Sequence, residues 1–325
     1  MSAFILRRLM QAGVAILIVT LIVFFGVSVI GNPVDILVSP DCNQACHAQA
    51  VAALGLDKPL FQQYLIFLWN VLHGRLGTSY VLGATAVDLI VQRLPATLEL
   101  AFSAMALSIS IGIPLGLWAG LRPDAMIGKS IMAGSILGFS LPTFWVGTMF
   151  IILFSVELGW LPPTGRGPTV PFFGIPVSFL TLEGLSHLAL PALNLALFNI
   201  SLVIRLTQAG VREVLLMDYI KFAYAKGLTG RRVILVHVLK NVLIPVVTVT
   251  GLELGNLIAF AVVTETIFAW PGMGKLIIDS IQVLDRPVIV AYLMITVTMF
   301  VIINLIVDIV YSLLDPRIRY QRSAG

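Results

Sequence analysis

Long apolar segments constrain this chain more than any other feature of its sequence. A helix needs ~20 mostly apolar residues to cross a bilayer. Six segments reach about that length, at residues 9–30, 95–121, 130–156, 188–210, 242–263 and 288–313. Because backbone groups in lipid must satisfy their hydrogen bonds within the segment, each is expected to be a helix. The sequence therefore predicts an all-α polytopic membrane protein with six transmembrane helices.

The composition supports the same class. Of 325 residues, 58% are hydrophobic and only 11% are charged, and the mean hydropathy is +1.01. A soluble protein of this length would need much more polar surface. The first apolar run is longer than the core of a cleaved signal peptide, so we interpret it as a retained anchor.

The distribution of basic residues predicts the orientation. With the N-terminus in the cytoplasm, 14 of the 20 Lys and Arg residues fall on the cytoplasmic side and 6 fall outside. This excess of positive charge favours cytoplasmic N and C termini. We expect one transmembrane domain over residues 1–325, with a sizeable external segment at 31–94, core spans at 95–313, a cytoplasmic loop at 211–241 and a cytoplasmic tail at 314–325. Apolar residues at helical spacing from Leu60 to Val71 predict a short amphipathic helix in the external segment.

Two cysteines, Cys42 and Cys46, lie in this external segment. Together with the adjacent His47 they fall short of a four-ligand zinc site, so no metal site is predicted. In an oxidising compartment, a local disulfide is the simpler interpretation.

The sequence carries no pattern typical of catalysis. It has no phosphate-binding G-x-x-x-x-G-K-[ST] loop, and its four histidines are scattered without an H-E-x-x-H pattern. We expect no enzyme activity, no bound cofactor and no nucleic-acid binding.

Carboxylates inside apolar segments are costly and suggest function. Glu99, Glu265 and Asp308 lie near the ends of predicted spans, where capping or solvation explains them. Glu253 lies deeper and is the best candidate for lining a transport pathway, although a structural hydrogen bond to a neighbouring helix explains it equally well. Glycines at four-residue spacing from Gly112 to Gly120 predict close helix packing.

The cytoplasmic loop contains the most unusual run, DYIKFAYAKGLTGRRVILVHVLKN at residues 218–241. Aromatic and basic side chains alternate there, and Gly227 and Gly230 interrupt the run. Two short helices joined at a glycine turn would present an aromatic and basic docking surface. The alternative is an ordinary solvated loop.

This run resembles the cytoplasmic "EAA" loop of binding-protein-dependent ABC importer permeases of the dipeptide, oligopeptide and nickel family. The resemblance continues through FILRRL, LGLDKPLFQQY, SLPTFWVG, ELGWLPPTG, VVTETIFAWPGMGK and NLIVDIVYSLLDPRIRY, so it covers nearly the whole chain. The chain departs from the family pattern at Phe222, where Thr is usual, and at Tyr224, where Arg is usual.

The resemblance implies a permease subunit in a prokaryotic plasma membrane. It implies a homologous second permease, two ATPase subunits that use ATP and Mg, an external substrate-binding protein and surrounding lipid as partners. The loop would dock on an ATPase through Asp218, Tyr219, Lys221, Ala223, Lys226 and Gly227. Di- and oligopeptides are the expected substrates, with nickel, glutathione or a small glycoconjugate as alternatives within the family. From another class, an ion-coupled carrier or channel without an ATPase stays open.

Overall fold

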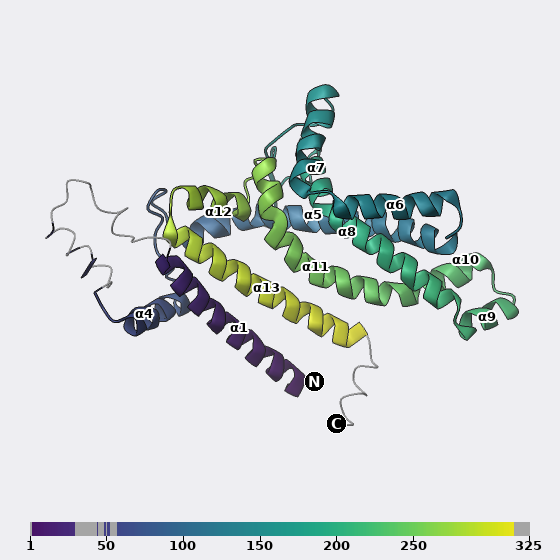
Figure 1. Ribbon diagram of the computed structural model, residues 1–325, viewed down its shortest axis with the longest axis horizontal. Coiled ribbons are helices and arrows are strands. Elements are labelled where there is room, and N and C mark those ends of the chain that lie inside the picture. Colours follow the sequence, from purple (N-terminus) through teal and green to yellow (C-terminus); the bar gives the residue numbers. More distant parts are fainter. Residues whose placement is uncertain (1, 30–43, 45–48, 50, 53–56, 315–325) are drawn as a thin grey trace. The chain divides into compact units, whose positions relative to one another are not determined.

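The structure, a computed structural model, describes residues 2–29, 44, 49, 51–52 and 57–314 (Figure 1). These residues fall into two compact units. One lies within Met1–Leu94 and Leu276–Ile302, and the other within Pro95–Lys275 and Ile303–Gly325.

The first unit packs short connecting segments against long helices. It contains α1 (Ser2–Val29), α4 (Leu60–Leu72), the start of α5 (Ala86–Leu121) and most of α12 (Met273–Gln282) and α13 (Arg286–Leu314). The hydroxyls of Thr20 on α1 and Tyr64 on α4 lie 2.9 Å apart, and the Phe24 ring packs edge-on against Tyr64. The Ser79 hydroxyl donates to the carboxylate of Asp285, which fixes the loop before α5 to the start of α13.

The second unit is built around α8 (Leu182–Leu215), which packs against α6, α7 and α11. Its other elements are the rest of α5, α6 (Met126–Ser140), α7 (Thr143–Phe150), η1 (Ile151–Glu157), β1 (Val170–Phe172), β2 (Ile175–Val177), α9 (Asp218–Ala225), α10 (Gly230–Arg232), η2 (Val233–Val238) and α11 (Leu239–Ile267). The antiparallel β1–β2 hairpin lies in the connection between η1 and α8.

The predicted polytopic helical class is confirmed. Among the described residues, five segments are long and apolar enough to cross a membrane: Arg7–Gly26, Ala86–Leu121, Leu182–Leu215, Gly230–Ile267 and Arg286–Val307. The helices extend beyond the predicted spans because charged and polar turns continue them outside the apolar core. The predicted second span at 95–121, for example, belongs to a helix that starts at Ala86.

The prediction of one continuous helix at 130–156 is wrong. α6 ends at Ser140, α7 begins at Thr143, and the two segments are bent by 105°. Leu141 and Pro142 are both extended, with ψ of 135° and 129°. A residue before proline is driven out of the helical region, which explains the break at this point. The pair makes a sixth span only if it crosses the membrane as one broken helix.

The predicted close packing at the glycines is confirmed. A Cβ on Gly112 would lie 2.7 Å from the side chain of Val203, and one on Gly116 would lie 2.6 Å from the carbonyl oxygen of Ile204. Gly120 makes an equally close approach further along α8. Such distances are far below ordinary carbon contacts, so only glycine lets α5 lie this close to α8.

Candidate functional site

The predicted cytoplasmic loop forms a short helix, α9, with defined ends. Met217 is extended before it (φ −69°, ψ 142°), and Asp218 places a carboxylate in its first turn. A negative charge there interacts favourably with the N-terminal end of the helix dipole.

A Schellman motif ends α9. The Gly227 amide donates to the carbonyl of Tyr224 over 2.9 Å, and the Leu228 amide donates to that of Ala223 over 3.3 Å. Gly227 has a φ of +76°, a left-handed conformation that glycine adopts without strain. The predicted glycine turn is confirmed at this position. Gly230, by contrast, begins α10 instead of breaking a helix.

The inner face of α9 anchors it to the second unit. Ile220 is 1% exposed, and Ala223, one turn further, is also buried. Both belong to an apolar cluster whose other members come from α8, η2 and α11: Val203, Val211, Val233, Val238, Val242 and Val246. The helix is therefore attached to the transmembrane helices by a continuous core.

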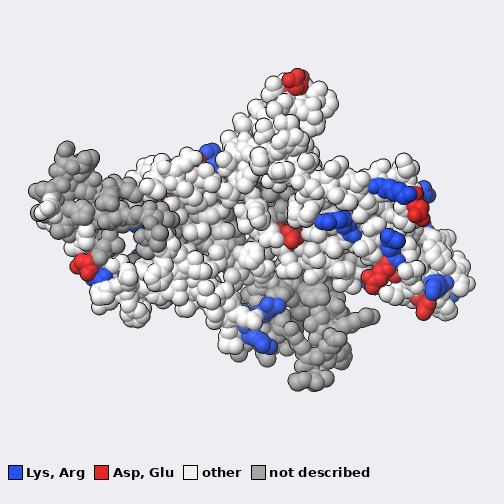
Figure 2. Space-filling model, viewed as in Figure 1, with Lys and Arg blue, Asp and Glu red and all other residues white. Residues whose placement is uncertain are grey.

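The outer face of α9 presents aromatic and charged side chains. The exposed aromatic and charged side chains on α9 and on the residue directly after it are Asp218, Tyr219, Lys221, Phe222, Tyr224 and Lys226. Phe222 is 60% exposed, and the Lys226 ammonium lies 4.6 Å from the centre of its ring. Figure 2 shows both basic and acidic side chains over the end of the second unit that carries α9 and α10. We name this exposed set the α9 face.

An exposed ion pair lies within the α9 face. The Lys221 ammonium lies 2.9 Å from Asp218 Oδ1. This hydrogen bond and the positive charge lower the pKa of Asp218 below its usual value of 3.8. The carboxylate is therefore ionised at neutral pH.

A polar contact joins α9 to the start of α11. The Asn241 amide donates to the Tyr219 hydroxyl over 3.0 Å and to the carbonyl of His237 over 2.7 Å. α10, η2 and α11 follow one another directly along the segment Gly230–Ile267. α9 is therefore joined by a hydrogen bond to the segment that forms the candidate span Gly230–Ile267.

The structure separates the predicted docking residues into two groups. Five are exposed: Asp218, Tyr219, Lys221, Lys226 and Gly227. Ala223 instead faces inward and lets α9 pack closely on its own chain. Phe222 and Tyr224, which depart from the family pattern and are not among the predicted docking residues, also lie on the α9 face.

A cavity of about 390 Å³ lies in the second unit between α8, α11 and the start of α7. Apolar side chains line most of it, and Thr143, Asn199, Glu253, Asn256 and Thr264 supply polar groups. The Asn256 amide donates to Glu253 Oε2 over 3.2 Å from the same helix. Among the described residues, the buried Oδ1 of Asn199 has no hydrogen-bond partner. The cavity thus offers a carboxylate and a carbonyl oxygen as acceptors.

The Glu99 carboxylate has a structural role, because it accepts hydrogen bonds from groups in another segment of the chain. It accepts hydrogen bonds from the Arg166 guanidinium, from the amide and hydroxyl of Ser178, and from the amide of Phe179, all between 2.5 and 2.9 Å. This carboxylate therefore fixes the segment around the β1–β2 hairpin to α5.

Glu265 is fully buried and caps a helix. Its Oε1 accepts from the Thr97 hydroxyl over 2.6 Å, and its Oε2 accepts from the Lys275 amide in the first turn of α12 over 3.0 Å. The Thr97 oxygen in turn accepts from the Met273 amide over 2.8 Å. The capping interpretation of Glu265 is confirmed.

Two predicted features lie outside what the structure describes. Cys42 and Cys46 are not among the described residues, so their disulfide stays a prediction. The side chain of Asp308 is also outside the described set.

Family models match nearly the whole chain. A model of the family described as "Binding-protein-dependent transport system inner membrane component" matches residues 112–320. A second, described as the N-terminal part of such a membrane component, matches residues 1–101.

Curated relatives match along their entire length. The dipeptide transport system permease protein DppB of Escherichia coli K12 is 39% identical over 343 aligned positions, covering 99% of this chain and all of that protein. The di/tripeptide permease DppB of Pseudomonas aeruginosa is 40% identical over 99% of this chain, and the oligopeptide permease AppB of Bacillus subtilis is 38% identical over 98%, each matched in full.

A solved structure shares the fold. The inward-facing MetNI methionine ABC transporter contains a chain that superposes with a TM-score of 0.53 at 15% identity. The match covers 70% of this chain and 96% of that one.

Proposed function

This chain belongs to the family of binding-protein-dependent transport system inner membrane components, and we propose that it carries di- and oligopeptides inward as one of two homologous permease subunits. It is a multi-pass ABC importer permease of the inner membrane, its role is transport, and it works together with ATPase and other subunits. The peptide assignment rests on relatives whose names specify dipeptides, tripeptides and oligopeptides and which match this chain along its full length.

The proposed mechanism depends mainly on one observation, which is that α9 has one buried face and one exposed face. Its inner residues Ile220 and Ala223 belong to the core of the chain, while its outer face exposes aromatic and basic side chains. A face of this kind is typical of the centre of a protein interface. In our proposal each permease subunit seats this helix in one of two ATPase subunits.

The contacts of α9 explain how ATP hydrolysis would drive transport. ATP and Mg are used in the ATPase subunits, and their closure displaces α9. The Tyr219–Asn241 hydrogen bond and the buried cluster pass this displacement to α11. The permease then changes between inward-open and outward-open states, because a packed core has discrete alternative arrangements. Asp218, Lys221, Lys226 and Gly227 complete the docking surface.

The cavity around Glu253 supports a peptide pathway. A zwitterionic peptide presents an ammonium group, and Glu253 supplies the one carboxylate among the residues that line this cavity. Asn199 and Asn256 add amides that can bond the peptide backbone. An external substrate-binding protein would deliver the peptide.

Reconstitution tests the proposal directly. The permease is co-expressed with its homologous partner and ATPases, placed in proteoliposomes and supplied with binding protein and a labelled dipeptide. We expect ATP-dependent uptake that unlabelled peptides compete away and that Ni²⁺ and glutathione do not. Uptake driven by an ion gradient without ATP would instead identify a carrier, and competition by Ni²⁺ or glutathione alone would reassign the substrate.

A further inference from the structure

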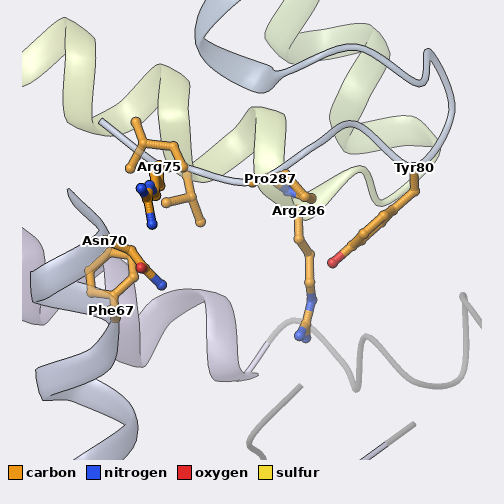
Figure 3. Close-up of a pocket in the computed structure, with 9 residues that line it drawn as sticks. Phe67, Asn70, Arg75, Tyr80, Arg286 and Pro287 are labelled. Carbon is orange, nitrogen blue, oxygen red and sulfur yellow. The ribbon is translucent and has the colours of Figure 1, made fainter. Parts of the chain in front are cut away.

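A second pocket, of about 310 Å³, lies in the first unit beside α4 (Figure 3). Phe67 and Asn70 of α4 line one side of it, and Arg286 and Pro287 at the start of α13 line another. Arg75, Leu76, Gly77 and Tyr80, from the loop before α5, and Val290 of α13 complete the lining. Figure 3 shows the Tyr80 hydroxyl directed toward the Arg286 side chain.

Hydrogen bonds hold the walls of this pocket in place. The Arg75 amide donates to the carbonyl of Asn70 over 2.8 Å, which ties the loop to the end of α4. The Tyr80 amide donates to Asp285 Oδ1 over 3.2 Å, which ties the same loop to the start of α13. A Cβ on Gly77 would lie only 3.1 Å from Pro287, so the loop and α13 are in close contact. The residues around the pocket are therefore held in fixed positions within the first unit.

Two helices place the pocket at the membrane surface. Arg286 is the first residue of the apolar segment Arg286–Val307, so the pocket lies where this helix enters the bilayer. On the other side, Phe67 packs against Phe24, with ring centroids 5.7 Å apart, and Phe24 lies within the last turn of the span Arg7–Gly26. Both contacts place the pocket at the depth of the lipid headgroups.

α4 itself has the surface of an interfacial helix. Only one side of it meets α1, through Tyr64 and Phe67. Its other residues include six large exposed apolar side chains: Leu60, Phe61, Leu65, Ile66, Trp69 and Leu72. Such a patch on one 13-residue helix is unfavourable in water and favourable at the boundary between headgroups and acyl chains. Trp69, 62% exposed, is of the residue type enriched at that boundary.

The charges of the pocket select an anion. Arg75 and Arg286 contribute two guanidinium groups, which bind phosphate oxygens with paired N–H donors. Burial raises the pKa of Tyr80 above its usual value of 10.0, so its hydroxyl remains a donor. Phe67, Pro287 and the neighbouring α4 surface provide an apolar border on which an acyl chain can lie.

We propose that this pocket binds the phosphate headgroup of an anionic phospholipid from the leaflet on that side, with the acyl chains lying along α4. The ligand class is a phosphodiester with a net negative charge, such as phosphatidylglycerol. Bound lipid fixes α4 and the start of α13 at a constant depth. This inference depends on the membrane location of the chain and not on which substrate is transported.

Native mass spectrometry of the purified complex tests the proposal. The complex is transferred to a neutral detergent and titrated with phosphatidylglycerol or with phosphatidylcholine. We expect phosphatidylglycerol to be retained more tightly, and Arg75→Gln to weaken its binding about fivefold, as removing one surface cation should. Because Arg75 is exposed, the variant should fold normally. Arg75→Lys should keep part of the affinity.

Lys58→Gln is the matched control, because it removes an exposed cation from outside the pocket lining. It should leave phosphatidylglycerol retention unchanged. Inorganic phosphate and a free dipeptide are added as competitors, and neither should displace the lipid. The proposal is overturned if both lipids bind equally, if Lys58→Gln weakens binding as much as Arg75→Gln, or if the free dipeptide or phosphate displaces the lipid.

Discussion

Three carboxylates in the apolar helices differ in their hydrogen-bond partners, and these partners indicate different roles. Glu99 and Glu265 each accept several hydrogen bonds from groups fixed by the fold. Glu253 accepts one from Asn256 on its own helix and lines a cavity. Their positions in the sequence predicted capping or solvation for the first two, and either a pathway role or a structural hydrogen bond for the third. Arg166 and Ser178, which bind Glu99, and Thr97, which binds Glu265, lie 67 or more residues away along the chain, so no local pattern could identify them.

Removing the Glu265 carboxylate should destabilise the chain. Glu265→Ala would leave the buried Thr97 hydroxyl and the Lys275 amide without their acceptor, and we expect a loss of about 3 kcal/mol. Thermal unfolding of the purified protein in detergent measures this. Glu157→Ala removes an exposed carboxylate and should change the midpoint little. Equal midpoints for the two variants would show that Glu265 is not a structural cap.

Glu253→Gln should reduce transport without reducing stability. The substitution keeps the size of the side chain and its bond to Asn256, so the unfolding midpoint should stay close to that of the natural chain. Uptake of a zwitterionic peptide should fall about tenfold, because a neutral amide replaces the carboxylate that pairs with the peptide ammonium group. Uptake at the natural rate with an intact complex would remove Glu253 from the pathway.

At the scale of elements, α9 was the most predictable part of the functional site. Its glycine turn, its aromatic residues and its basic residues are all visible in one run of sequence. The division into faces was not, because it depends on where α8, η2 and α11 place the apolar cluster. The inward position of Ala223 follows from this packing.

The two glycines of this loop provide a matched pair of variants. Gly227→Ala forces a Cβ into a left-handed conformation at φ +76° and should cost about 1 kcal/mol, loosening the end of α9. Gly230→Ala lies in a helix with nothing close to its Cβ and should be neutral. We expect only Gly227→Ala to lower the peptide taken up per ATP hydrolysed. If the two variants take up the same amount of peptide per ATP hydrolysed, the left-handed turn at Gly227 plays no part in coupling.

The break between α6 and α7 was not predicted because apolarity alone does not distinguish a straight span from a bent one. Pro142 disfavours helix at Leu141, which a sequence can indicate. The 105° angle depends on α7 packing against α8 and α11, which only the folded chain determines.

At the scale of the whole molecule, hydropathy predicted the class and basic residues predicted an orientation. The structure of a single chain indicates partner subunits only through exposed surfaces that no other part of the chain covers. The α9 face is such a surface, and we expect it to be needed for assembly with the ATPase and not for folding of the permease.

The double variant Phe222→Ala, Tyr224→Ala should therefore still fold and insert into the membrane. The amount of ATPase that co-purifies with it should fall at least about tenfold, because aromatic residues contribute most of the binding energy in protein interfaces. Phe173→Ala removes an aromatic side chain that is even more exposed, on the β1–β2 turn, and should leave co-purification unchanged.

Crosslinking from the α9 face tests the central claim most directly. A photoreactive amino acid is placed at Phe222 in the assembled, membrane-embedded transporter, and at Phe173 as the control. We expect a permease–ATPase adduct from position 222 and none from position 173. An intact, ATP-hydrolysing complex in which position 222 reacts only with lipid or solvent would contradict this claim.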